Sequence, residues 1–82
     1  MKKLLIVDDS TTFRRVIKKM MSAYNCEVLE AANGVIGYEM IYKHSPDLVL
    51  LDVSMPRMDG GTLLKKLKSD PSLQDVPVIM VT

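Results

Sequence analysis

Three aspartates stand where two apolar runs of the sequence end. Asp8 and Asp9 directly follow the run LLIV at residues 4–7, and Asp52 closes the run LVLL at residues 48–51. Carboxylates that end neighbouring parallel strands meet at one edge of a sheet, where sites form in open α/β folds. They repel one another unless a cation joins them, and Mg²⁺ takes carboxylate and carbonyl oxygens together with phosphate. The pattern predicts a magnesium site at which Asp52 is an oxygen nucleophile toward phosphorus.

The residues behind Asp52 turn the chain away from this edge. Met55-Pro56 and Asp59-Gly60-Gly61 follow within nine residues of it, and both are combinations that favour turns. We expect this turn to aim one backbone carbonyl at the metal. Asp59 is interpreted as a turn residue and not as a ligand.

The elements that must position these acids alternate between strand and helix. Strands are predicted at 3–7, 26–31, 48–52 and 76–82, and helices from Ser10 to near Tyr24-Asn25, from Asn33-Gly34 to about His44, and over a short stretch with Leu63, Leu64 and Leu67 that ends at Asp70-Pro71. This order predicts a parallel sheet with right-handed crossovers and helices on its faces. Residues 26–31 alternate in polarity, which favours an edge strand with Val28 inward and Glu27 outward.

The first predicted helix has one apolar and one basic side. Its apolar stripe is Phe13, Val16, Ile17, Met20 and Met21. Because these residues recur at helical spacing, we expect the stripe to face the core. Arg14, Arg15, Lys18 and Lys19 are expected on the solvated side.

Composition indicates one small domain, residues 1–82, and gives no reason to expect binding to a membrane or a nucleic acid. The chain has 82 residues, is 48% hydrophobic and has a formal net charge of +1. A charge near zero gives no electrostatic case for nucleic acid or an anionic membrane, and no run approaches the roughly 20 apolar residues of a membrane span. The lone Cys26 cannot form an internal disulfide, which fits a reducing compartment, so we expect a cytoplasmic protein.

The sequence resembles the receiver domain of two-component response regulators, the CheY-like family. Three motifs carry the resemblance: LLIVDDS at 4–10, PDLVLLDVSMPRMDG at 46–60 and VPVIMVT at 76–82. It implies a flavodoxin-like α/β fold with a parallel sheet of strand order 2-1-3-4. It also implies a signalling module that accepts a phosphoryl group from a histidine kinase with Mg²⁺, and that is not an enzyme acting on other substrates.

The resemblance assigns a role to each matching position. It implies that Asp52 is the phospho-acceptor, that Asp9 binds Mg²⁺ directly and that Asp8 acts mainly through a bound water. Ser54 would offer its backbone carbonyl to the metal. Thr82 matches the switch hydroxyl that turns toward the phosphoryl group on activation.

The family pattern continues past the last residue of this sequence through a helix, a fifth strand and a final helix. That fifth strand ends in a lysine that contacts the phosphoryl group, so we expect an N-terminal receiver fragment that is impaired in phosphorylation. An uncovered sheet face and a bare edge beside VIMV at 78–81 predict association. We therefore expect a homo-oligomer or completion by another polypeptide.

Two other functions remain open. A truncated receiver could act only as an association unit without phosphorylation, which the missing lysine favours. An aspartate-nucleophile phosphatase of the haloacid dehalogenase type also starts from an aspartate, but it needs a second acid two residues later. Ser54 stands at that position.

Overall fold

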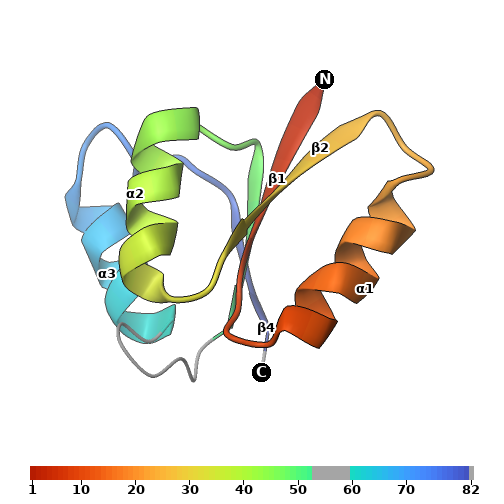
Figure 1. The fold of residues 1–82 in the computed structure, drawn as a ribbon. Coiled ribbons are helices and arrows are strands. Elements are labelled where there is room, and N and C mark those ends of the chain that lie inside the picture. Colours follow the sequence, from red (N-terminus) through yellow and green to blue (C-terminus); the bar gives the residue numbers. More distant parts are fainter. Residues whose placement is uncertain (53–59, 82) are drawn as a thin grey trace.

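The computed structural model describes residues 1–52 and 60–81 and arranges them as one parallel sheet flanked by helices (Figure 1). The elements are β1 (Lys2–Val7), α1 (Thr11–Met21), β2 (Cys26–Ala31), α2 (Gly34–His44), β3 (Leu48–Asp52), α3 (Gly60–Ser69) and β4 (Val78–Val81). The strand order is β2-β1-β3-β4 and each pairing is parallel. The predicted fold class, strand order and edge position of β2 are confirmed. Among the described residues no helix is long and apolar enough to span a bilayer.

The main core lies on the face of the sheet that α2 and α3 cover, while α1 lies on the opposite face (Figure 1). Alternate strand residues point to opposite faces, so the inward residues of β1 and β3 form the floor of this core. The residues buried there include Leu5, Val7, Val49 and Leu51 from the strands and Ile41, Leu63 and Leu67 from the helices.

Capping residues set the helix ends that lead into and out of the strands. The Ser10 hydroxyl accepts a hydrogen bond from the Phe13 amide at 3.1 Å, and the Asn33 side chain accepts one from Ile36 at 2.9 Å. Both are N-caps that satisfy an amide without a helical partner. Ser45 ends α2 with φ of 48°, in the left-handed region, directly before Pro46. These signals explain why the predicted bounds of α2 match the observed ones.

Helix α1 departs from the prediction in length and in burial. It ends at Met21, before the predicted end near Tyr24-Asn25. The Ser22 hydroxyl donates a hydrogen bond to the Lys19 carbonyl at 2.6 Å, and this bond competes with continuation of the helix. None of its residues is buried, and Val16 and Met20 are 50% and 62% exposed. The expectation that the stripe packs inward is confirmed in part: Phe13, Ile17 and Met21 are half-buried, but Val16 and Met20 are not, and α1 contacts mainly the edge strand β2.

The last strand begins later than predicted. The Val76 amide bonds the Leu73 carbonyl at 3.1 Å, which keeps Val76 in the preceding turn. Pro77 has no N–H for the ladder, although its carbonyl accepts the Val49 amide at 3.0 Å. Strand β4 therefore starts at Val78, and Thr82 lies outside the described residues.

A polar contact joins α2 to the turn that follows α3. The Tyr38 hydroxyl donates to Asp70 Oδ2 at 3.1 Å, while Asp70 Oδ1 accepts from the amide and hydroxyl of Ser72 at 3.0 and 2.8 Å. The bonds from Ser72 lower the pKa of Asp70, and the bond to Asp70 raises the pKa of Tyr38. The Lys66 ammonium lies 5.6 Å from the centre of the Tyr38 ring. These contacts fix the two core-covering helices relative to each other.

Gly37 provides a test of how closely α2 packs on the sheet. A Cβ at this position would lie 2.9 and 3.0 Å from the two γ-methyl groups of the buried Val7. Overpacking costs about 1–3 kcal/mol, which outweighs the gain of about 1 kcal/mol in helix propensity. We expect Gly37→Ala to lower the free energy of unfolding, measured by urea denaturation. In a Val7→Ala background the same change should stabilise the protein, and an equal loss in both backgrounds would contradict this explanation.

Candidate functional site

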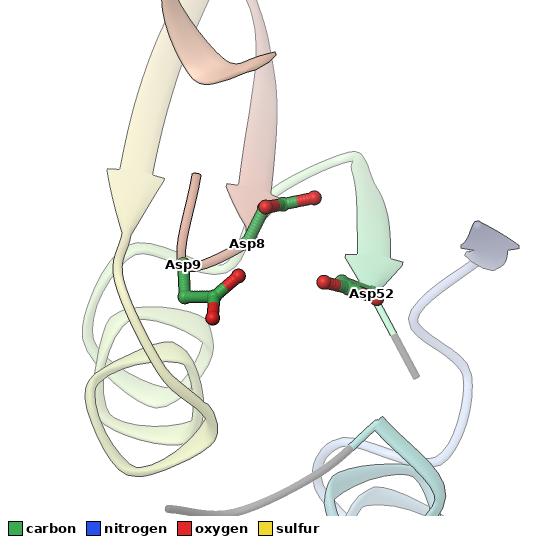
Figure 2. A group of neighbouring side chains, drawn as sticks. All are labelled: Asp8, Asp9 and Asp52. Carbon is green, nitrogen blue, oxygen red and sulfur yellow. The ribbon is translucent and has the colours of Figure 1, made fainter. Parts of the chain in front are cut away.

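Three carboxylates converge at the carboxyl edge of the sheet. Strands β1 and β3 pair in parallel with Val7 opposite Leu51, so the residues that follow each strand lie at the same edge. One carboxylate oxygen each of Asp8, Asp9 and Asp52 lies within 4.8 Å of the other two. Figure 2 shows Asp9 and Asp52 facing each other across the gap below the strand ends, with Asp8 beside them. The edge therefore gathers the three aspartates singled out from the sequence.

Asp8 is held through both its backbone and its side chain. Its amide donates to the Ala31 carbonyl at 3.0 Å, and its Oδ1 accepts from the Ser10 amide at 2.8 Å. It is 8% exposed, whereas Asp52 is half-buried and Asp9 is exposed. The group therefore opens toward solvent on the side of Asp9.

The donor set fits a hard divalent cation. All three donors are carboxylate oxygens, which Mg²⁺ and Ca²⁺ prefer over nitrogen and sulfur. Oxygens bound directly to one Mg²⁺ lie at most about 4.2 Å apart, since each bond is about 2.1 Å long. A spread of up to 4.8 Å suits an ion held directly by part of the set and through water by the rest.

Arg14 is part of this edge, although its sequence pattern placed it on the solvated side of α1. Its side chain is only 13% exposed. Its Nη1 donates to the Asp8 carbonyl, and its Nε donates to Glu30 Oε1 at 3.1 Å. One feature of the sequence could have indicated this contact. Val28 was predicted to point inward, and Glu30, two residues later, lies on the same face of β2. A carboxylate that points inward needs a polar partner.

The remaining predicted site residues, Ser54 and Thr82, lie outside the described residues. So do Met55-Pro56 and Asp59 of the predicted turn, whereas Gly60 and Gly61 are the first two residues of α3 and not part of that turn. The metal carbonyl and the switch hydroxyl therefore stay predictions from the sequence.

Comparison with known proteins gives a consistent set of relatives. Residues 4–82 match the profile of the response regulator receiver domain. The chain is 45% identical over 82 residues to chemotaxis protein CheY1 of Helicobacter pylori, covering 98% of this chain and 66% of that protein. Thus the chain spans just under two thirds of the length of this relative.

Solved structures agree with the sequence relatives. The N-terminal domain of a response regulator receiver protein from Methanoculleus marisnigri matches with a TM-score of 0.95 and 36% identity, over 100% of this chain and 67% of that chain. The Mn(2+)-bound form of response regulator Rcp1 matches with a TM-score of 0.87 and 25% identity, over 98% and 64% of the two chains.

The acidic group predicts a specific response of stability to magnesium. Mg²⁺ that binds only the folded chain should raise the free energy of unfolding, by about 2.7 kcal/mol at a hundredfold excess over the dissociation constant. Asp9→Asn removes one donor and one repelling charge, so it should raise the melting temperature in EDTA and weaken the response to Mg²⁺.

Thermal unfolding followed by circular dichroism, with and without MgCl₂, measures both effects. Asp75→Asn is the matched control, because Asp75 is an exposed carboxylate outside the group. It should respond to Mg²⁺ as the wild type does. An unchanged magnesium response in Asp9→Asn would contradict the predicted role of this edge.

Proposed function

The chain belongs to the response regulator receiver domain family, and on this premise we propose that it accepts a phosphoryl group on Asp52 from a histidine kinase, with Mg²⁺ held by the acidic edge. Receiver domains take phosphoryl groups from histidine kinases and are generally signalling modules without an enzymatic role of their own. The observation that carries the proposal is the convergence of the Asp8, Asp9 and Asp52 oxygens within 4.8 Å. The cytoplasmic location expected from the lone Cys26 is part of this proposal.

The burial of the three aspartates supports a division of roles among them. Asp9 is exposed and is proposed as a direct ligand, while Asp8, buried and bonded to the Ser10 amide, is proposed to act mainly through a water. The Ser54 carbonyl as a further ligand and Thr82 as the switch hydroxyl belong to the same proposal.

Asp52 is the proposed nucleophile. It is the last residue of β3, and Val49 and Leu51 of the same strand are fully buried. The core therefore holds the backbone that carries Asp52. In the proposed step an Asp52 oxygen forms a bond to phosphorus while the P–N bond of a kinase phosphohistidine breaks. The leaving electron pair goes to the imidazole. Bound Mg²⁺ would neutralise charge on the transferring oxygens.

Small phosphodonors test this function without the partner kinase. We expect incubation with acetyl phosphate and MgCl₂ to add one phosphoryl group to a fraction of the protein, in keeping with the impaired phosphorylation expected from the sequence. Intact-protein mass spectrometry detects the adduct. The adduct should be absent in Asp52→Asn and in EDTA, and present in the Asp75→Asn control.

The negative outcomes separate the alternatives. No adduct on the wild type would overturn the proposal and leave the association unit as the better description of this chain. Steady turnover of an added phosphomonoester would instead support an aspartate-nucleophile phosphatase.

We further propose that the chain associates with itself through apolar residues exposed on the α1 side of the sheet, among them Val16, Met20 and Ile79. Val16 and Met20 lie on α1, and Ile79 pairs with Leu50, on the face opposite the main core. These three side chains are between 50% and 62% exposed. Exposed apolar surface of this kind favours association, with a complementing polypeptide as the other occupant.

Sedimentation velocity over a range of concentrations tests this self-association. We expect the wild type to sediment faster as concentration rises, because apolar surface is buried between copies. Met20→Lys should shift the chain toward the monomer. Tyr42→Lys is the control, since Tyr42 is 66% exposed but lies on α2, on the other side of the sheet. A wild type that is monomeric at every concentration would refute the proposal.

A further inference from the structure

We propose that Arg14 is a positioning residue for the acidic edge, because it fixes the peptide that joins Asp8 to Asp9 and thereby orients the Asp9 carboxylate toward Asp52. The inference rests on the proposed function, since it names the residue that sets the cation affinity of the same site. It assigns Arg14 no contact with a cation or a phosphoryl group.

Hydrogen bonds hold both ends of the Asp8 backbone. Its amide donates to Ala31 of the neighbouring strand at 3.0 Å, and its carbonyl accepts from Arg14 Nη1. The peptide unit is planar, so the direction of the Asp8 carbonyl also sets the direction of the Asp9 amide and Cα. Loss of the Arg14 contact would leave this plane free to rotate, and Asp9 would rotate with it.

Arg14 is itself held in place by three contacts from different parts of the chain. Besides the Asp8 carbonyl, it bonds Glu30 Oε1 on β2 at 3.1 Å and Thr11 Oγ1 on α1 at 3.4 Å. A guanidinium is planar and its donors have fixed directions, so three partners determine its orientation. The Arg14 side chain is 13% exposed, against 61% for Lys18, which lies 3.8 Å from the second Glu30 oxygen. The arrangement therefore connects α1, β2 and the end of β1.

Charge and position predict opposite effects on cation affinity when Arg14 is replaced. The guanidinium is positive and near the proposed cation site, so its charge alone weakens Mg²⁺ binding, and removing that charge would strengthen it. Removing a group that orients ligands weakens metal binding, typically 10–100-fold. The sign of the change therefore distinguishes a positioning role from a purely electrostatic one.

Mg²⁺ titration of the 82-residue chain by isothermal calorimetry measures this sign. We expect Arg14→Met to weaken Mg²⁺ binding about tenfold or more. Arg14→Lys should weaken it similarly, because one ammonium keeps the charge but cannot bridge the Asp8 carbonyl and Glu30. Arg15→Met is the matched control: it removes the same charge from the exposed neighbouring residue and should leave affinity unchanged or slightly higher.

Amide NMR spectra give a second readout that stability alone would not move. In folded Arg14→Met, the Asp9 amide resonance should shift before any Mg²⁺ is added, while resonances of the core strands stay in place. If circular dichroism shows that Arg14→Met is unfolded, Arg14→Lys and Glu30→Gln decide the question. Glu30→Gln keeps an acceptor for Arg14 and should retain more affinity than Arg14→Lys.

The outcomes separate failure of the inference from failure of the proposed function. A wild type that binds no Mg²⁺ would overturn both. A wild type that binds Mg²⁺, with folded Arg14 variants that bind it equally or more tightly, would overturn the positioning role alone.

Discussion

Parallel pairing of β1 with β3 brings three negatively charged aspartates together at the carboxyl edge of the sheet. The core and the polar contacts around this edge hold them there despite their repulsion. The register that puts Val7 opposite Leu51 also puts the aspartates that follow them within 4.8 Å of one another. The pairing is held by the core, because Leu5, Val7, Val49 and Leu51 are almost completely shielded from solvent. A shift in register would disrupt the packing of these residues, so the core maintains an arrangement that electrostatics alone would separate.

The polar contacts around the edge act on orientation more than on charge. Asp8 accepts the Ser10 amide and Arg14 donates to the Asp8 carbonyl, so both the side chain and the backbone of this residue are directed. Arg14 depends in turn on Glu30, which belongs to the edge strand β2. The strand that contributes no carboxylate to the site therefore still helps to define its geometry.

Local sequence signals predicted the strands and the meeting of the three aspartates, because apolar runs and capping residues mark where each element ends. The apolar runs ending in Asp8 and Asp52 fixed two strand ends, and Asn33 and Ser45 marked the limits of α2. The errors arose where distant parts of the chain decide the outcome. Nothing in a helical pattern separates Arg14 from Arg15; only the position of Glu30 does. The burial of the α1 stripe likewise depends on which strands α1 covers, and it contacts mainly β2.

Under the proposed function, phosphorylation of Asp52 would increase the repulsion between negative charges at this edge. A phosphoryl group carries about −1.5 to −2 charges near neutral pH, more than the single charge of the Asp52 carboxylate it would replace. The added charge would lie beside Asp8 and Asp9, so the modified edge would need a cation more than the unmodified edge does. Asp8 and its backbone are already held by Ala31, Ser10 and Arg14. Rearrangement to relieve repulsion would therefore fall more on the exposed Asp9 than on the buried Asp8.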